Sequence, residues 1–424
     1  MADVNADTND NDEEAAYPTA IDLCAGCGGF SHGAQMVGFN VRAAFETAPA
    51  PTYTYKVHIA DHDDMALLSR DVTEGVPTDV IERVAPGGVD AVFAGPPCQP
   101  FSESAGEHYD GDPTDTVAYA VAEWIETLSP KVAAIENVGG LRRNHERVLD
   151  TVLETIRAAG YRIGTISVDA ANYGVPQHRE RVFVLCVRDD LSPPVQWQPP
   201  ITHTDDPQQT LLGTSGDLEP FTTTREALDD LPRPLTPQRP YNDVIHGISL
   251  YDDNRVTPHS CGRWLSIDEE GRYYRADGPD NAQEVLVPPN HIETGHQEQT
   301  REKMAQYPHG YSGSSTTERR LHPDRPAPTM TVSEGTPPIH YVGRTPDNDA
   351  PVAQVRRLTV REAACLQTFP EHWCFAGTKV ERFRQVCNAV PPVLASHIAA
   401  HLRETIEANA DGAEQPATNP TPVK

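Results

Sequence analysis

The sequence predicts an α/β fold in which a mixed, mainly parallel sheet flanked by helices carries a smaller, loop-rich module. Short apolar segments alternate with helical patterns between residues 18 and 190, which is typical of parallel sheets. Residues 191–355 then hold 22 of the 39 prolines and show no sustained helical period, so we expect loops and short strands there. Helical spacing returns after residue 356, and we expect the C-terminal segment to complete the α/β domain.

Seven apolar segments are the predicted strands. They lie at residues 19–24, 41–46, 67–72, 89–94, 132–137, 163–169 and 181–187. Amphipathic helices are expected over residues 114–129 and 146–159, because apolar side chains recur there at helical spacing. Gly160 is expected to end the second of these helices. Further helical patterns cover residues 358–369 and 391–407.

These patterns divide the chain into five parts. Both ends are polar and lack apolar periodicity, which predicts disordered tails. In chain order we predict an acidic tail (1–17), an α/β domain (18–190), the loop-rich module (191–355), a segment that completes the α/β domain (356–409) and a second tail (410–424).

The composition indicates adaptation to very high salt. The chain has 34 basic and 62 acidic residues, a net charge of −28, and only five of the basic residues are lysines. Such a surface normally argues against a nucleic-acid partner, because phosphate binding depends on Lys and Arg. At molar ionic strength, however, the Debye length falls to about 3 Å, so repulsion among carboxylates is screened and a dense acidic surface stays soluble. We therefore predict a protein from a halophilic organism.

Three observations predict a cytoplasmic enzyme. No stretch approaches about 18 consecutive apolar residues, which excludes the membrane-spanning class. The N-terminus is acidic, whereas a signal peptide begins with basic and then apolar residues. Eight scattered cysteines are too few for a disulfide scaffold in so long a chain, and they fit a reducing compartment.

A glycine-rich turn follows the first predicted strand, in residues 22–30 (DLCAGCGGF). A strand that runs into such a turn and then into a helix lets the backbone approach a nucleotide-like ligand at the carboxyl edge of a parallel sheet. The dinucleotide fingerprint itself is not matched. Glu46 closes the second strand, where it could bind ribose hydroxyls, and Asp71 closes the third, where it suits an adenine amino group. Acidic residues at successive strand ends favour a ligand site over scattered capping carboxylates.

A cysteine on a stiff loop follows the fourth predicted strand, in residues 95–102 (GPPCQPFS). Two prolines restrict the backbone before Cys98 and fix the direction of its sulfur, which suits a nucleophile better than a structural thiol. The fifth strand ends in Glu136, and Arg179 and Arg181 lie where the last strand begins. Adjacent strand ends are thus expected to bring a thiol, a carboxyl and two guanidinium groups to one edge.

Six motifs, in this order, resemble those of the DNA (cytosine-5)-methyltransferases. Besides the two already quoted, they are ENV at 136–138, QHRER at 177–181, RLTVREAACLQTFP at 357–370 and QVCNAVPP at 385–392. Together they span most of the chain outside the tails. The resemblance implies a Rossmann-like domain that uses S-adenosyl-L-methionine, with residues 191–355 in the place of the family's target recognition domain.

The resemblance assigns catalytic roles to Cys98, Glu136, Arg179 and Arg181. Cys98, as a thiolate, would attack C6 of a cytosine and form a covalent adduct, while Glu136 would hold and protonate N3. Arg181, with Arg179 nearby, would contact the base oxygen. Because C6 is inaccessible in a stacked duplex, the nucleotide would be flipped into the site. Residues 102–112 would form the loop that closes over it.

The implied cofactor is S-adenosyl-L-methionine. Its binding residues in this chain would be Asp22, Cys24, Ala25, Gly26, Gly28, Gly29, Phe30, Glu46, Thr47, Asp71, Val72, Pro97, Asn388 and Val390. The chain departs from the family pattern at Cys24, where an aromatic residue is common, at Thr47, where a bulky apolar residue is common, and at Cys387, where glycine is usual. The first two departures predict weaker packing against the adenine. Cys24 and Cys27 form a Cys-x-x-Cys pair without a second pair, so no zinc or redox site is expected.

Duplex DNA is the implied substrate. The residues expected to contact it are Gln99, Ser102, Arg319, Arg320 and Arg325. Arg356 and Arg357 are further candidates, although each arginine could instead be an ordinary solvated residue. Residues 325–331 (RPAPTMT) resemble the core that precedes variable recognition loops in the family. The chain has seventeen histidines, but His291, His296, His309 and His322 lack ligand spacing, so no metal is expected.

Two other functions stay open at this point. A tRNA cytosine-5-methyltransferase would share the fold but has a smaller insertion between the QHRER and RLTVREAACLQTFP motifs, so the long insertion at 191–355 favours sequence-specific DNA. A catalytically silent DNA-binding homologue conflicts with intact Cys98, Glu136 and Arg181. We expect a monomer with no membrane partner. The recognised sequence stays open, as does a separately encoded endonuclease that would make the pair a restriction-modification system.

Overall fold

The computed structural model describes residues 17–60, 65–97, 111–137, 146–206, 218–234, 266–267, 273–276, 282–285, 290–313, 318–331 and 336–411. Nearly all of the two predicted tails lies outside these residues. Cys98, Gln99, Ser102 and most of the predicted closing loop also lie outside them. Within the described ranges, no helix is long and apolar enough to cross a membrane.

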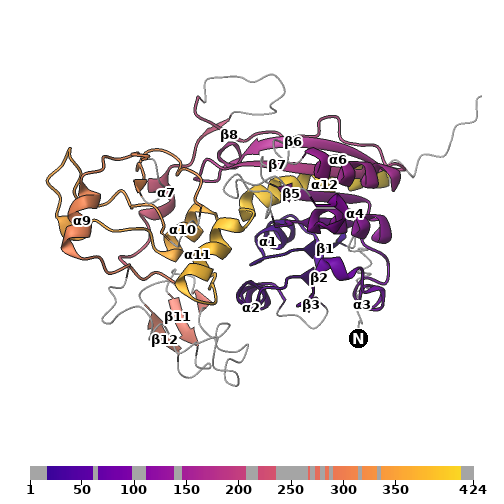
Figure 1. Cartoon of the computed structure of the whole chain (residues 1–424), viewed down its shortest axis with the longest axis horizontal. Helices are drawn as coiled ribbons and strands as arrows, with labels where there is room; N and C mark the ends of the chain where they lie inside the picture. The colour runs from indigo at the N-terminus through magenta and orange to yellow at the C-terminus, as the bar shows by residue number, and fades with distance from the viewer. Residues whose placement is uncertain are drawn as a thin grey trace, which may run out of the picture.

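A seven-stranded sheet lies in the right-hand part of the view in Figure 1, with its strands in the order β3-β2-β1-β4-β5-β7-β6. Its strands are β1 (Thr19–Leu23), β2 (Asn40–Phe45), β3 (Ala66–Leu68), β4 (Ala91–Ala94), β5 (Val132–Asn137), β6 (Tyr161–Asp169) and β7 (Glu180–Arg188). Neighbours from β3 through β5 are parallel, whereas β7 runs antiparallel to both β5 and β6. The predicted α/β class with a mainly parallel sheet is confirmed.

The third strand is shorter than predicted, and its end shows why. A strand was expected over 67–72, but β3 ends at Leu68. The carboxylate of Asp71 accepts hydrogen bonds from the backbone N–H of Thr73 at 2.9 Å and from its hydroxyl at 2.7 Å, which starts a short 3₁₀ helix over Val72–Glu74. Such local side-chain bonds compete with strand pairing. Asp71 therefore lies beyond the strand instead of closing it.

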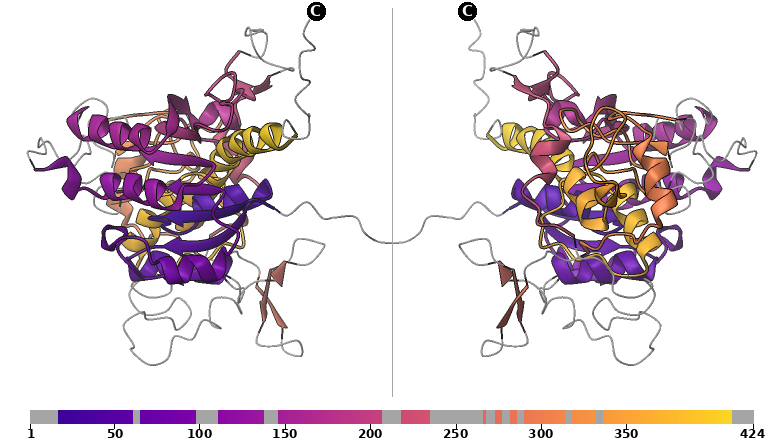
Figure 2. Two further views of the ribbon diagram at one scale, coloured as in Figure 1. Left: turned by 90° about the vertical axis from the view of Figure 1, so that its right-hand side faces the viewer. Right: turned by 90° about the vertical axis from the view of Figure 1, so that its left-hand side faces the viewer.

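Helices cover both faces of the sheet. The bounds of these helices are α1 (Gly29–Met36), α3 (Thr78–Val84), α4 (Val117–Leu128), α6 (Glu146–Ala158) and α12 (Pro392–Asp411). α3, α4 and α6 share one buried apolar cluster with the strands, and α1 and α12 share another on the opposite face. Figure 2 shows the yellow α12 on the side of the sheet away from the purple α4 and α6.

Helix ends follow local sequence signals. The hydroxyl of Thr116 accepts a hydrogen bond from the N–H of Tyr119 at 3.2 Å, which starts α4 slightly after the predicted residue 114. Gly160 follows α6 with φ +86°, a left-handed conformation that glycine adopts without strain, as predicted. The helical pattern predicted over residues 391–407 corresponds to α12, in which Leu394 and Ile398 are fully buried.

A third apolar cluster joins helices that lie far apart in the sequence. These helices are α2 (Pro49–His58), α7 (Thr224–Leu228), α10 (Val360–Leu366) and α11 (Lys379–Asn388). One more α-helix, α9, covers Glu298–Ala305, and short 3₁₀ helices lie at Pro113–Asp115, Ala170–Tyr173 and Val352–Gln354. The short strands outside the large sheet are β8 (His203–Thr204), β9 (Glu219–Pro220), β10 (Ser266–Ile267), β11 (Tyr273–Ala276) and β12 (Ala282–Val285). The described part of 191–355 is thus rich in loops and short strands, and the domain boundaries stay a prediction.

Candidate active site

The carboxyl ends of the parallel strands β1, β2, β4 and β5 meet at one edge of the sheet. Segments that follow adjacent parallel strands become neighbours in space even when they are distant in the sequence. This edge holds the turn after β1, Glu46 directly after β2, Pro97 after β4, and Glu136 near the end of β5. Ala94, the last residue of β4, pairs with Ile135, so the chain that leads to Cys98 starts beside Glu136.

The glycine-rich turn after β1 has an uncommon backbone conformation. Cys24 and Gly26 both have φ +56°, and Gly28, the N-cap of α1, has φ +92°. A Cβ atom on Gly28 would lie 2.4 Å from Cδ1 of Ile59, so a side chain there would clash. Non-glycine residues with positive φ are uncommon and concentrate at functional sites, which makes Cys24 the strained residue of the turn.

Glu46 joins this turn to the end of β2 through hydrogen bonds from its carboxylate. Its Oε2 accepts a hydrogen bond from the N–H of Gly26 at 2.9 Å, and its Oε1 accepts one from the N–H of Ala48 at 2.8 Å. The backbone N–H of Ala25 donates to the carbonyl of Phe45 at 2.9 Å. Each carboxylate oxygen has a further lone pair, so Glu46 can still accept a bond from a ligand hydroxyl. Thr47 is exposed beside it.

The C-terminal segment approaches the first turns of α1. A Cβ atom on Gly29 would lie 2.2 Å from the carbonyl oxygen of Val390, and one on Gly33 would lie 2.4 Å from the carbonyl oxygen of Pro392. Only glycine permits so close an approach. Asn388 is the exposed last residue of α11, two positions before Val390. The structure therefore brings predicted cofactor residues from the two ends of the chain together.

Asp22 is a buried carboxyl group at the end of β1, only 1% exposed. Its Oδ2 accepts a hydrogen bond from the hydroxyl of Ser31 at 2.5 Å, and that hydroxyl lies 2.6 Å from the hydroxyl of Tyr55. Its Oδ1 has no hydrogen-bond partner among the described residues. Burial raises the pKa of Asp22 to about 7, although the bonds from Ser31 act in the opposite direction. The site thus holds a carboxyl oxygen to which none of the described residues donates a hydrogen bond.

The remaining predicted cofactor residues differ in how far their side chains are buried. Phe30 is buried, with its ring centroid 4.8 Å from that of Phe93 in β4. Val72 is buried, and its carbonyl accepts a hydrogen bond from the indole N–H of Trp124 at 2.8 Å. Pro97 and Asp71 are exposed, and the bonds from Thr73 lower the pKa of Asp71. Asp71 is therefore already engaged by its own turn.

Glu136 and Arg181 form a nearly buried ion pair. Oε1 of Glu136 lies 2.7 Å from Nε of Arg181, and the two side chains are 8% and 11% exposed. The contact is electrostatic, because the Nε–H bond is not aligned for a hydrogen bond. Antiparallel pairing places Glu136 opposite Phe183, two residues after Arg181, so Glu136 and Arg181 lie on the same face of the sheet. The predicted carboxyl and guanidinium groups are thus in contact.

Arg179 is buried beside the C-terminal segment, with 1% of its surface exposed. Its Nη2 donates to the carbonyl of Ala389 at 3.1 Å, and its backbone N–H donates to Oδ1 of Asp169 at 2.8 Å. Oδ2 of Asp169 lies 2.8 Å from Nδ1 of His178. Arg179 thus connects the QHRER motif to the segment that carries Val390, and its predicted contact with a base stays a prediction.

Arg320 does not have the environment expected of a DNA contact. It is 1% exposed, and its Nη1 and Nη2 donate to six backbone carbonyls, those of Met304, Tyr307, Tyr341, Val342, Gly343 and Arg344. Burial lowers its pKa to about 10. A guanidinium group enclosed by carbonyls cannot reach a phosphate without breaking this cage. We therefore correct the prediction for Arg320 and assign it to the folding of the module.

The other predicted DNA arginines differ in exposure. Arg325 is exposed, and Arg319 is half-buried with Nη1 donating to the carbonyl of Thr329 at 3.1 Å. Arg356 is buried and donates to both carboxylate oxygens of Glu362, at 2.8 and 2.6 Å, which gives it a structural partner instead of DNA. Arg357 is half-buried and donates to the carbonyl of Pro337 at 2.7 Å. Arg325 is the candidate that the structure leaves most accessible.

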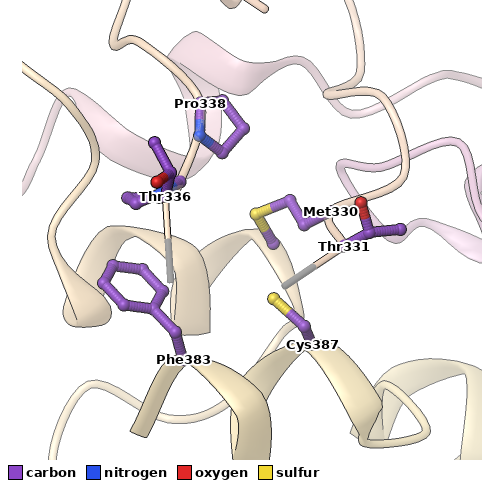
Figure 3. Close-up of a pocket in the computed structure, with 7 residues that line it drawn as sticks. Met330, Thr331, Thr336, Pro338, Phe383 and Cys387 are labelled. Atoms are coloured by element: carbon purple, nitrogen blue, oxygen red, sulfur yellow. The ribbon is translucent and has the colours of Figure 1, made fainter. Parts of the chain in front are cut away.

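Cys387, the departure from glycine in the QVCNAVPP motif, lines a small and largely apolar pocket (Figure 3). Figure 3 shows its sulfur directed toward Met330, with Phe383 of the same helix on the other side of the pocket. Burial raises the pKa of the Cys387 thiol to about 12. The side chain therefore fills space between α11 and the segment around Met330, and its burial disfavours the thiolate form.

Sequence reasoning missed three residues of this site. Ser31 bonds to the carboxylate of Asp22, and Tyr55 bonds to the hydroxyl of Ser31. No local sequence signal identifies either residue. Asp169 ends an apolar strand, so its polar character at that position is a signal that could have been used.

The described residues contain no group of three or more His, Cys, Asp or Glu side chains that could hold a metal. Cys24 and Cys27 are free thiols whose pKa values burial raises.

The chain is similar to known proteins over most of its length. The family model described as C-5 cytosine-specific DNA methylase matches residues 19–404. The Type II methyltransferase M.AgeI of Thalassovita gelatinovora is 30% identical over 449 aligned residues, which cover 91% of this chain and 99% of that protein. The Type II methyltransferase M.DdeI of Desulfomicrobium norvegicum is 28% identical over 409 residues, covering 90% of this chain and 88% of that protein.

A solved structure shares the fold. An E. coli prophage-encoded protein assigned as a DNA modification methyltransferase superimposes with a TM-score of 0.63. The two sequences are 22% identical, and the match covers 92% of this chain and 99% of the other. At this identity the likeness concerns the fold.

Proposed function

The chain belongs to the C-5 cytosine-specific DNA methylase family, and we propose that it methylates C5 of a cytosine flipped out of a specific duplex sequence, through a covalent adduct with Cys98. Membership of the family makes it a DNA (cytosine-5)-methyltransferase. The observation that carries the finer proposal is the Glu136–Arg181 pair, 2.7 Å apart and nearly buried beside the strand that leads to Cys98. The proposal of a specific sequence draws on the relatives, which are named Type II methyltransferases.

The residues at the sheet edge fit S-adenosyl-L-methionine. Oδ1 of Asp22 is buried and has no hydrogen-bond partner among the described residues, and it suits a cationic group such as the ammonium of the methionine moiety. Glu46 has lone pairs left for ribose hydroxyls, and no atom lies within 4 Å of a Cβ built on Gly26, so the turn has open space beside it. When bound, the cofactor supplies an electrophilic methyl group at C5 of the base.

The chain's own groups would prepare and restore the base. The thiolate of Cys98 would add to C6 while Glu136 gives a proton to N3, which places the electron density of the ring at C5. Arg181 would hold the base oxygen and balance the charge that develops there. After methylation, loss of the C5 proton to a base, expulsion of the thiolate from C6 and return of the N3 proton to the carboxylate of Glu136 would restore the aromatic ring and free Cys98.

A suicide substrate tests this proposal. A duplex with 5-fluorocytosine at the target position lacks the hydrogen that must leave, so wild-type protein is expected to form an adduct that survives denaturing electrophoresis. Cys98→Ala should form none, whereas Cys365→Ala, which removes a thiol of α10 away from the proposed site, should react as the wild type does. An adduct with Cys98→Ala would overturn the role of this residue. Equal methyl transfer to tRNA in the same buffer would contradict a DNA-specific substrate.

The net charge of −28 supports a second proposal, that the enzyme works in concentrated salt. In dilute buffer its carboxylates repel one another and DNA phosphates over a Debye length of about 10 Å or more. Molar salt shortens that length to about 3 Å and removes most of the repulsion. Folding and DNA binding are therefore both expected to need high ionic strength.

A further inference from the structure

Four positively charged or protonatable side chains lie together where residues 293–301 approach α11. They are His296 and Arg301 from that segment, Arg357 from the segment before α10, and Lys379, the first residue of α11. Burial and the charges of the other three groups lower the pKa of His296 to about 4. We call these four residues the cationic cluster.

Hydrogen bonds join the cluster to three segments of the chain. Nζ of Lys379 donates to the hydroxyl of Thr294. Nη1 of Arg301 donates to the carbonyl of Val355 at 2.7 Å. The stretch that holds Thr294 and Arg301 is therefore joined both to α11 and to the residues just before Arg357.

The cluster concentrates positive charge in a partly buried place. Lys379 is half-buried, and burial together with the charge of Arg357 lowers its pKa to about 8. Burial also lowers the pKa of Arg357. Oε1 of Glu293 lies 3.7 Å from Nη2 of Arg301, which places one negative charge beside that arginine. The lowered pKa values of Lys379 and His296 show that neighbouring positive charges still act on both groups.

His296 has a ring nitrogen whose hydrogen-bonding capacity is not used. Its Nε2 is buried and has no hydrogen-bond partner among the described residues. Because the pKa of His296 is about 4, the ring is neutral near pH 7 and carries its hydrogen on one of its two nitrogens. A buried N–H without an acceptor is unfavourable, and so is a group of like charges. A bound anion removes both penalties, because it accepts the hydrogen bond and offsets the positive charge.

We propose that the cationic cluster binds a small inorganic anion, chloride in potassium chloride solution, between the side chains of Lys379, Arg357 and His296. A small ion suits this place better than a DNA phosphate, because Nε2 of His296 is buried and the backbone of a duplex stays at the protein surface. The long, flexible side chain of Lys379 lets its ammonium turn from Thr294 toward the ion. The ion holds the segment before α9 against α11, so chloride stabilises the fold specifically as well as by screening.

Thermal unfolding followed by circular dichroism tests the site. Potassium chloride replaces potassium glutamate, whose anion is much larger, while the total salt is held at about 2 M so that screening stays constant. The Tm of the wild-type protein should rise and level off, by about 3 °C if chloride reaches about 100 times its Kd. Lys379→Met keeps most of the side-chain length and removes the charge, so most of this rise should disappear. The matched control is Lys303→Met at an exposed position of α9, which should keep the rise.

Comparison of variants in identical solutions removes the general effects of each salt on protein stability, which all the proteins share. An equal rise in the wild type and in Lys379→Met would overturn the inference. If Lys379→Met lacks the circular dichroism signal of a folded protein, His296→Phe takes its place, because it removes the Nε2 donor and should also lose most of the rise. Either result leaves the proposed catalytic residues untouched, since methyl transfer is not the quantity measured.

Crystals grown in potassium bromide locate the ion by anomalous scattering. We expect a bromide peak in contact with Nζ of Lys379 and near Nε2 of His296. A peak at this place together with equal chloride effects in solution would mean binding at crystal concentration only, and would also overturn the inference. A raised KM for DNA in Lys379→Met, without a bromide peak or a chloride effect, would assign the cluster to a DNA phosphate instead.

Discussion

Replacing Asp22 with asparagine is expected to stabilise the cofactor-free protein above neutral pH. The folded protein raises the pKa of Asp22 from its ordinary 3.8 to about 7, because the carboxyl is buried and one oxygen has no donor among the described residues. A rise of this size corresponds to about 4 kcal/mol that opposes ionisation in the folded state. Asparagine has nearly the same shape and no charge, so it removes this penalty.

The sign of the pH dependence follows from the two pKa values. Below about 3.8 Asp22 is protonated in both the folded and the unfolded chain, so the penalty is absent. Between 3.8 and about 7 the unfolded chain alone ionises, and the stability of the wild-type protein falls as the pH rises. Above about 7 the loss is complete. Neighbouring groups that contribute are Ser31, whose hydrogen bonds to the carboxyl oppose the rise, and Glu46, whose charge acts in the same direction as burial; Tyr55 bonds to the hydroxyl of Ser31.

Guanidinium chloride unfolding in molar salt measures this effect. The difference in unfolding free energy between Asp22→Asn and the wild type should grow from near zero at about pH 4 to about 4 kcal/mol at about pH 8. Asp71→Asn is the control with the opposite sign, because hydrogen bonds lower the pKa of Asp71. A difference that does not change with pH would refute the reasoning. If the open oxygen also binds a cofactor cation, calorimetry of S-adenosylmethionine binding near pH 6 should detect proton release in the wild type and none in Asp22→Asn.

Three further predictions follow from the site and the surface. Arg320→Met should lower the unfolding free energy by about 3 kcal/mol or more, because it leaves six carbonyls without their donor. Arg325→Met, at an exposed position, should leave the denaturation midpoint unchanged. Equal midpoints for the two variants would contradict the assignment of Arg320 to the folding of the module. Glu136→Gln should lower kcat by about 10²- to 10⁴-fold while calorimetric binding of S-adenosylmethionine persists, and near-wild-type turnover would exclude a role in proton transfer. Methyl transfer should rise with KCl to an optimum at high concentration, with the circular dichroism signal weakened in dilute buffer; full activity and an unchanged melting curve at low salt would refute the proposed adaptation to salt.

The sequence by itself determined the α/β class, the main helices and the strands of the sheet to within two residues, apart from the third strand, which ends at Leu68 and not at residue 72. Apolar segments of strand length alternate with helical stripes, and these local patterns are sufficient because burial on both faces of a parallel sheet leaves few other arrangements. The apolar segments of strand length place Glu46 and Glu136 at or near strand ends and Arg181 near the start of the last strand. Their contacts in space then follow from the order of the strands.

Only the tertiary structure decided which charged residues are buried. Arg320 and Arg325 look alike in the sequence, since both are arginines in a proline-rich stretch, yet six carbonyls drawn from residues 304–344 enclose the first and leave the second exposed. In the same way, nothing near Asp22 in the sequence shows that Tyr55 and Ser31 cover it, or that the hydroxyl of Thr329 reaches the carbonyl of His178. Periodicity reports which face of an element is apolar. The partner of a buried polar group depends on how distant segments pack, and local pattern carries no record of that.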